Sequence, residues 1–320
     1  MQINRIPIAA EFAEAFDMTA TRIIVTADSE PWVRIAAATM TGFATSVIAC
    51  GVEAGIEKFL GEEETPDGRP GASILLFGFS RDSLVEPVRN RVSQCILTCP
   101  GTACFAGVPA DDAKGSAIPL GRSLRYFGDG FQTAKRLYLP AANTPDGELV
   151  ERRFWRIPVM DGEFLCEDML GHMPAIGGGN FLIFGESRRQ ALLAAEAAVI
   201  AMKQLPEVIM PFPGGVVRSG SKVGSRYPAL MASTNQAYCP TLVGIADTSL
   251  PNGVAAVYEI VIDGLSFKAI AEATRVGILA ACGSAAGGIL GISAGNYGGN
   301  LGRHHFKLLE ILAGSQGVTR

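Results

Sequence analysis

The order of apolar and polar positions in the first half of the chain is repeated in the second half. Each half opens with a short apolar run, an acidic residue followed by serine, and a segment with helical apolar period. These features lie at 23–25, Asp28-Ser29 and from Pro31 onward, and again at 182–184, Glu186-Ser187 and 188–204. A serine placed there is suitable N-cap chemistry, so both halves are predicted to begin with a strand and a capped helix.

The repetition continues beyond the first helix. A pair of glycines four residues apart is followed by a Pro-Asp-Gly or Pro-Asn-Gly turn, a second apolar strand and a second helix. These features are Gly51 and Gly55, 65–68, 72–79 and 82–98 in the first half, and Gly220 and Gly224, 250–253, 255–262 and 266–282 in the second. Pro-Asp-Gly and Pro-Asn-Gly are turn signals that lead into a hairpin strand.

Each half therefore has the order strand, helix, strand, strand, helix and closing strand. That order is typical of the ferredoxin-like split βαβ arrangement, in which two helices cover one face of an antiparallel sheet. The predicted fold class is α+β with two duplicated lobes, 1–160 and 161–320. A dinucleotide-binding domain is not expected, because the glycines at 177–179 precede a strand, whereas the dinucleotide fingerprint follows one.

One irregular segment, 211–241, interrupts the second half. It is rich in glycine, hydroxyl and amide residues, carries lysine and arginine, and has no carboxylate. Structureless segments of this length are uncommon inside compact domains and are usually functional or disordered. Apolar anchors such as Phe212 and Tyr238 argue for a folded loop that binds an anionic or polar ligand.

Composition narrows the class of protein. The chain has 48% hydrophobic and 18% charged residues and a net charge of -4, which gives no reason to expect a nucleic-acid partner. The uncharged run 276–302 is long enough to span a bilayer, but its nine glycines make a poor lipid-facing surface. The N-terminus lacks the build of a signal peptide. We therefore expect a soluble cytoplasmic protein, with some of its sparsely charged surface covered by other subunits.

Cysteine and histidine indicate little chemistry of their own. Seven cysteines without paired spacing fit a reducing compartment and small buried side chains. None of the three histidines has zinc-ligand spacing, so no metal site is expected. A covalent intermediate requires a positioned base, which favours direct transfer between two bound substrates if the protein is an enzyme.

Glu259 is the most informative acid in the sequence. It is the only charged residue in the apolar strand segment AAVYEIVI, and strand alternation places it on one face with Val257 and Val261. A carboxyl group on such a face has a raised pKa and acts as a proton donor near neutral pH. The alternative is a carboxylate that faces solvent or pairs with Lys222, and the residues alone leave both interpretations open.

Asparagines and cations near glycine-rich connections are the other candidates. Asn180 and Asn296 offer donors and acceptors where glycine permits close approach of a ligand, although asparagine also serves turn geometry. Four cations lie in or beside these connections and are suited to carboxylates or phosphate, with solvated charge as the alternative: Arg69, Arg218, Lys222 and Arg226.

At these residues the chain resembles the formylmethanofuran:tetrahydromethanopterin formyltransferases. The resemblance runs in order over essentially the whole chain, and such long strings are highly specific. The matching strings are EFAEAF, TGFATSVIACGVEAGIE, EETPDGRPG, FGDGFQ, WRIPVMDGEFLCED, GGNF, PFPGG, SKVGS, ASTNQAYCPT, VYEIVIDGL and SAGNYGGNLG.

The resemblance implies two ferredoxin-like lobes, a homo-oligomer that is typically a tetramer, and transfer of a formyl group between the amine of methanofuran or methylofuran and N5 of a tetrahydropterin. It implies a ternary complex without metal or prosthetic group, with Glu259 as the catalytic acid. It also identifies candidate coenzyme-binding residues, which are Thr45, Ser46, Glu53, Arg69, Asp129, Asn180, Ser219, Lys222, Ser233, Thr234, Asn235, Tyr238 and Asn296.

Three departures are similar to the forms in methylotrophic bacteria. The chain is less acidic than archaeal relatives, the segment 134–152 is longer, and the tail beyond His305 is extended. Those forms use dephospho-tetrahydromethanopterin and work in a complex with a formyl hydrolase, so the segment and tail are candidate contacts with hydrolase subunits, or ordinary surface variation. A non-catalytic coenzyme-docking or scaffold subunit is the alternative function, but it has no need of a buried acid.

Overall fold

The computed structural model describes residues 1–110, 117–140, 149–285 and 287–314. Among these residues no helix is long and apolar enough to cross a membrane. The described part of the chain forms two compact units of mixed α+β structure. The middle unit is Met18–Ala175, and the terminal unit combines Met1–Asp17 with the described residues from Ile176 onward.

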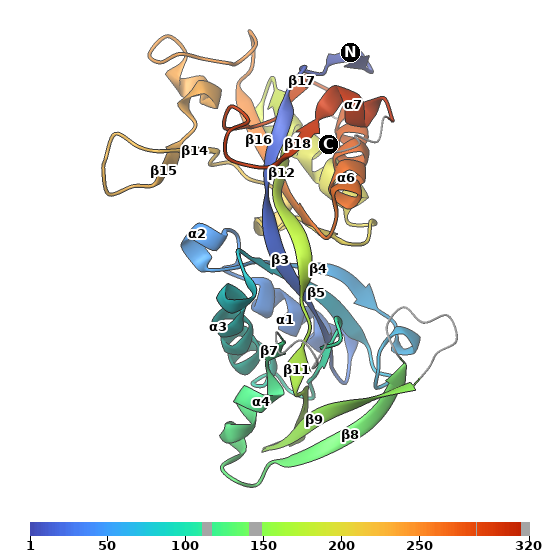
Figure 1. The fold of residues 1–320 in the computed structure, drawn as a ribbon. Coiled ribbons are helices and arrows are strands. Elements are labelled where there is room, and N and C mark those ends of the chain that lie inside the picture. Colours follow the sequence, from blue (N-terminus) through green and yellow to red (C-terminus); the bar gives the residue numbers. More distant parts are fainter. Residues whose placement is uncertain (111–116, 141–148, 286, 315–320) are drawn as a thin grey trace. The chain divides into compact units, whose positions relative to one another are not determined.

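The middle unit starts within β3, the long strand Phe12–Thr26. Its further elements, labelled in part in Figure 1, are α1 (Glu30–Thr41), α2 (Val47–Cys50), β4 (Glu53–Leu60), β5 (Gly71–Gly78), α3 (Arg81–Arg91) with a π-helical extension (Val92–Ile96), β6 (Ala103–Ala106), β7 (Ile118–Pro119), α4 (Gly121–Leu124), β8 (Thr133–Pro140), β9 (Leu149–Val159), β10 (Gly162–Glu167) and β11 (Met169–Leu170).

Four strands of the middle unit lie in the order β4-β5-β3-β6, and every neighbouring pair is antiparallel. The sheet continues through β10, which is parallel to β6, and then through β9 and β8. Both α1 and α3 cover the same face of the sheet (Figure 1). Met40 of α1 and Leu84 of α3 share one core with Ile23 and Ile74 of the strands.

The terminal unit takes up the chain within β12, the strand Met173–Gly185. Its other elements are β1 (Gln2–Ile3), β2 (Ile6–Pro7), α5 (Arg188–Met202), β13 (Val208–Ile209), β14 (Ser221–Val223), β15 (Ala232–Thr234), β16 (Ala256–Gly264), α6 (Phe267–Cys282), β17 (Ile289–Ser293), β18 (His304–Lys307) and α7 (Leu308–Leu312), with short 3₁₀ turns at Pro213–Gly215, Gln236–Tyr238 and Pro240–Leu242.

The strands of the terminal unit repeat the neighbour relations of the middle unit, in the order β13-β16-β12-β17 with antiparallel pairs. Alternation in β16 follows the prediction. Ile260 and Ile262 are fully buried among α5 and α6, whereas Val257 packs on the opposite face, the face on which Glu259 also lies. The sequence therefore separates a core face from a second face of the same strand.

Helix α5 packs closely because its inward positions are small. Ala191, Ala194 and Ala198 are completely buried against the sheet and α6. The side chain of Ser187 accepts a hydrogen bond from the Gln190 N–H, which confirms the predicted N-cap, whereas Ser29 begins α1 without such a bond. The acidic residue plus serine therefore marks both helix starts but caps only one.

The compact units are bounded at other residues than the two predicted lobes, whose boundary near residue 160 stays a prediction, and one predicted strand pairs differently from the expectation. The compact units do not divide near residue 160, because β10 and β11 pair within the middle unit and residues 12–15 pair with β18. The strand expected around Gly220 and Gly224 exists as β14, but it pairs with β15 in a separate hairpin, and only Val217 before it bridges to β16. Of the proposed partner contacts, 141–148 and 315–320 lie outside the described residues.

Gly185 gives a test of the close contact between α5 and β12. A Cβ added at Gly185 would lie 2.7 Å from Cβ of Ala191 and 3.1 Å from its backbone nitrogen, so the helix must move. We expect Gly185→Ala to destabilise the protein by about 1–3 kcal/mol, measured as a lowered thermal midpoint. Gly291→Ala on β17 is the control, because its nearest atom lies at an ordinary 3.4 Å; equal loss in both variants would contradict the packing account.

Candidate active site

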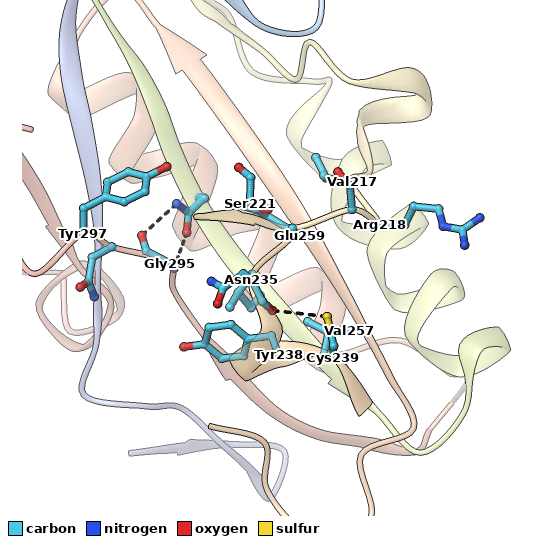
Figure 2. A pocket seen from close by; sticks show the side chains of 15 residues that line it. Val217, Arg218, Ser221, Asn235, Tyr238, Cys239, Val257, Glu259, Gly295 and Tyr297 are labelled. Atoms are coloured by element: carbon cyan, nitrogen blue, oxygen red, sulfur yellow. Dashed lines mark hydrogen bonds between the residues drawn. The ribbon is translucent and has the colours of Figure 1, made fainter. Parts of the chain in front are cut away.

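A pocket opens on the face of β16 that carries Glu259, and all its residues belong to the terminal unit (Figure 2). It combines one carboxyl group with hydroxyls, amides and a guanidinium. The lining residues are Asn180, Leu182, Val217, Arg218, Ser219, Gly220, Ser221, Asn235, Tyr238, Cys239, Val257, Glu259, Gly295, Asn296 and Tyr297. A concave site with a few convergent polar groups and one perturbed acid is the usual form of an active site.

Glu259 is held at the centre of this wall by backbone pairing on both sides. Leu182 of β12 lies opposite Glu259 on one side. On the other side the backbone N–H of Glu259 donates to the Val217 carbonyl at 2.9 Å, and its carbonyl accepts the Val217 N–H at 2.8 Å. No described residue forms a hydrogen bond or ion pair with its carboxyl group, including Lys222. Burial alone raises the pKa of Glu259 from 4.5 to about 7, so protonated and ionised forms coexist near neutral pH.

The cations of the irregular segment are left unpaired. Arg218 lines the pocket, Lys222 lies in β14, and Arg226 follows in the hairpin. None of the three forms an ion pair with a described residue, as expected in a segment without carboxylates. Positive charge without an internal partner, beside polar side chains, suits a ligand that carries negative charge.

The hairpin residues divide into two groups. Asn235 and Tyr238 line the pocket, and Tyr238 stacks on Phe184 with ring centroids 5.9 Å apart. Ser233 and Thr234 are engaged locally: Oγ of Ser233 donates to the carbonyl of Gly224, and the Thr234 hydroxyl contacts the sulfur of Cys239, which itself lines the pocket. The structure brings Ser219, Asn235 and Tyr238 together with Glu259, but leaves Lys222, Ser233 and Thr234 outside the lining.

Both predicted asparagines border the pocket with their amide groups already engaged. Asn180 accepts the Gly295 N–H at 2.6 Å and donates to the Gly295 carbonyl at 3.0 Å. Asn296 donates to Glu11 and Phe12 and accepts from Gly298. Their amides therefore shape the loop around Gly295, which matches the turn-geometry alternative.

The five remaining predicted binding residues lie in the middle unit, where internal contacts occupy several of them. Arg69 is enclosed by Asp28, Asp67, Thr26 and the Gly101 carbonyl. The others serve or flank local turns: Glu53 accepts from the Val47 N–H, Thr45 contacts Cys50, Ser46 precedes α2, and Asp129 adopts positive φ.

Ser221, Cys239, Gly295 and Tyr297 line the pocket but were not predicted individually. Tyr297 had a usable signal, since it is the one aromatic residue inside the glycine-rich string SAGNYGGNLG. Ser221 and Cys239 had none, because hydroxyl residues occur throughout the segment and its single cysteine forms no pattern with other residues. Within the described part of the chain, no cluster of histidine, cysteine and acidic side chains is arranged to hold a metal ion, and all seven cysteines are free.

Comparison with known proteins covers both halves of the chain. A family model described as formylmethanofuran-tetrahydromethanopterin formyltransferase matches residues 1–159, and one described as "FTR, proximal lobe" matches 162–311. The formylmethanofuran–tetrahydromethanopterin formyltransferase of Methylococcus capsulatus is 58% identical over 98% of this chain and 100% of that protein. One of the polypeptides of the formyltransferase/hydrolase complex of Methylorubrum extorquens is 55% identical over 97% of both chains.

Solved structures give the same result. A chain of the formyltransferase/hydrolase complex from Methylorubrum extorquens, crystallised with methylofuran, has a TM-score of 0.90 and 54% identity over 98% of both chains. A formylmethanofuran:tetrahydromethanopterin formyltransferase from Methanosarcina barkeri has a TM-score of 0.87 and 43% identity over 97% of this chain and 100% of that one.

The raised pKa of Glu259 makes stability depend on pH. The folded protein holds this proton more tightly than the unfolded chain does. The contribution of this group to the free energy of unfolding is therefore fully present below about pH 4.5 and is lost as the pH rises to about 7. We expect Glu259→Gln to remove this loss. Above pH 7 the variant should therefore have a higher thermal midpoint than the parent protein, and its free energy of unfolding should be larger by at most about 3 kcal/mol.

The two midpoints are expected to converge near pH 4.5. Glu196→Gln, at an exposed position on α5, gives the background for removing one carboxylate. A gain that is the same at pH 4.5 and pH 8 would contradict the burial of Glu259.

Proposed function

This chain belongs to the formylmethanofuran–tetrahydromethanopterin formyltransferase family, and from this premise we propose that the pocket around Glu259 is where the formyl group changes carrier. The protein is a formyltransferase of one-carbon metabolism, with methanofuran or methylofuran and tetrahydromethanopterin as its substrates. The observation that carries the site is a carboxyl group that no described residue pairs with, with a pKa of about 7, on the wall of a polar pocket.

We propose direct transfer in a ternary complex. The amine of one coenzyme attacks the formyl carbon carried by the nitrogen of the other, so that a new C–N bond forms and the carbonyl electron pair moves onto oxygen. As the tetrahedral species collapses, the carbonyl re-forms and the old C–N bond breaks. The leaving nitrogen takes a proton from protonated Glu259, and the resulting carboxylate accepts the proton released by the attacking nitrogen.

The pKa of Glu259 suits both directions of this exchange, since general acid–base efficiency is highest when the pKa of the group lies near the working pH. Protons and electrons balance over one carboxyl group, so the step as written needs no metal or prosthetic group. Holding both coenzymes in one pocket supplies most of the remaining advantage by orientation.

The unpaired cations give the pocket a preferred ligand charge. We propose that Lys222 and Arg218 hold negative charge on a coenzyme tail, while Ser219, Asn235 and Tyr238 contact its polar groups. Ser233 and Thr234 support the hairpin that carries Lys222. The candidates of the middle unit, Thr45, Ser46, Glu53, Arg69 and Asp129, are retained as weaker proposals because local contacts occupy several of them.

We also propose that the two halves of the chain arose by duplication of one ferredoxin-like lobe. Each unit has the order βαββαβ and the same antiparallel neighbours, which supports two duplicated ferredoxin-like lobes. The family models meet near residue 160, in agreement with duplicated halves 1–160 and 161–320. The different division into compact units then follows from the strand pairing of residues 12–15 with β18.

Assembly is also proposed rather than established. The relative in Methylorubrum extorquens is part of a formyltransferase/hydrolase complex, which supports association of this chain with formyl hydrolase subunits. We propose a homotetramer as its core, since many large apolar side chains of the isolated chain are exposed, including Tyr227, Met231 and Ile245.

Glu259→Gln tests the catalytic assignment. Glutamine keeps the size of the side chain but neither donates a proton as an acid nor accepts one, so turnover should fall about 10²–10⁴-fold while coenzyme affinity changes little. Steady-state formyl transfer and coenzyme titration of the purified protein measure both quantities. Glu196→Gln should match the parent protein; undiminished turnover in Glu259→Gln would show that Glu259 is not the catalytic acid, whereas a parent protein without formyl transfer would favour the scaffold function.

Lys222→Ala tests the binding role of the cationic hairpin. Loss of one charge-assisted contact should weaken binding of the anionic coenzyme about 10-fold, seen in KM, with kcat nearly unchanged. The dependence of KM on salt should also become shallower, because fewer charges attract the ligand. Lys203→Ala, at the exposed end of α5, is the control, and an equal effect there would reduce the result to net charge.

A further inference from the structure

The glycine-rich loop at 295–302 is wrapped around a carboxylate of the protein itself. Glu14 of β3 has no exposed surface. One of its carboxylate oxygens accepts the N–H groups of Tyr297 and Gly299 at 2.8 Å each, and the other accepts those of Leu301 and Gly302 at 2.6 Å each. Four backbone donors of one short loop therefore converge on one side chain.

The loop can adopt this shape only because of its glycines. Gly298 and Gly299 have φ of +78° and +74°, and a Cβ on Gly302 would lie 2.4 Å from the carbonyl oxygen of Ala15. Successive N–H groups turned inward form a nest, a shape that binds anions. Such a nest ordinarily suggests a site for an anionic ligand, but here the anion is Glu14.

The four hydrogen bonds keep Glu14 ionised. Burial acts to raise the pKa of this carboxyl, but the N–H groups of Gly302, Tyr297, Leu301 and Gly299 together outweigh it and hold the pKa below its usual value. Glu14 thus has the opposite environment from Glu259, which has no donor and a raised pKa.

The loop presents one polar side chain whose functional group remains available. The amides of Asn180 and Asn296 are used in fixing the loop, as described above. The hydroxyl of Tyr297 forms no hydrogen bond with a described residue, although its side chain is 37% exposed and lines the pocket. Figure 2 shows the Tyr297 ring entering the pocket from the loop with its hydroxyl directed inward.

We propose that Tyr297 donates a hydrogen bond to the oxyanion formed during transfer, and that Glu14 is the positioning residue that holds Tyr297 there. The proposal rests on the proposed function of the Glu259 pocket and deepens it. Glu259 then handles the protons, whereas the Tyr297 hydroxyl stabilises the charge on the former carbonyl oxygen.

The surroundings of Tyr297 suit a donor. Burial raises the pKa of its phenol, and the nearby carboxylates of Glu259 and Glu14 raise it further. A phenol with a raised pKa stays protonated at neutral pH, so it offers its hydrogen without becoming an anion that would repel the oxyanion. Tyr297 and Glu259 line the same pocket, so both side chains can face one reacting group.

A double-mutant cycle on the full-length protein tests the link. Tyr297→Phe removes only the hydroxyl, and kcat should fall about 10²-fold with KM little changed. Glu14→Gln turns an amide NH₂ toward two backbone N–H groups, so the loop shifts and kcat should also fall about 10²-fold. If Glu14 acts through Tyr297, the double variant should be no slower than about the slower single variant.

Glu167→Gln separates positioning from general loss of stability. Glu167 is a similarly buried carboxylate that accepts the Ala106 N–H and pairs with Arg152 in the middle unit. Its thermal midpoint should fall as that of Glu14→Gln does, but kcat per folded molecule should remain at the parent value.

The outcomes decide the proposal in each case. Unchanged kcat in Tyr297→Phe overturns it even if Glu14→Gln does not fold, and multiplying effects in the double variant overturn the role of Glu14. The parent protein and Glu259→Gln are assayed in parallel. Absence of formyl transfer by the parent, or full activity of Glu259→Gln, would instead show that the proposed function has failed.

Discussion

The two-residue period of β16 is the constraint on which the rest of the structure depends. Ile260 and Ile262 must face α5 and α6 because the core of the terminal unit is built around them. Glu259, between Tyr258 and Ile260, is therefore turned to the opposite face, where no described side chain balances its charge. A change of register by one residue would bury the acid in the core, so packing and chemistry are set by the same alternation.

Two carboxyl groups of the terminal unit have pKa values shifted in opposite directions, and the number of backbone N–H donors around each accounts for the difference. Glu14 receives four N–H groups and remains an anion, and Glu259 receives none and shares its proton near neutral pH. Environments that push two similar acids in opposite directions are a recurring way of assigning their roles. Here one acid is structural and organises a loop, and the other is exposed to the pocket and is available for proton transfer.

The absence of carboxylates from 211–241 has a physical consequence in the folded chain. Arg218, Lys222 and Arg226 have no local partner, so their charge remains available to a ligand. Arg69 is the contrasting case, because Asp28 and Asp67 enclose it and leave its guanidinium with internal contacts. Whether a cation is paired within the protein or left for a ligand thus depends on the carboxylates near it, and not on whether it is an arginine or a lysine.

The sequence by itself determined the order of elements, the repeated βαββαβ pattern, the serines at which α1 and α5 begin, and the position of Glu259 as the one charged residue of an apolar strand, since each rests on a short period or on neighbouring residues. It did not determine that the loop at 297–302 wraps around Glu14, because these hydrogen-bond partners are more than 280 residues apart in the sequence. Nor did it show that the amides of Asn180 and Asn296 form hydrogen bonds within the protein, since the sequence does not distinguish an asparagine that binds a loop from one that binds a ligand. Only the tertiary structure decided those assignments, because hydrogen bonds between distant strands and loops leave no periodic trace in the chain.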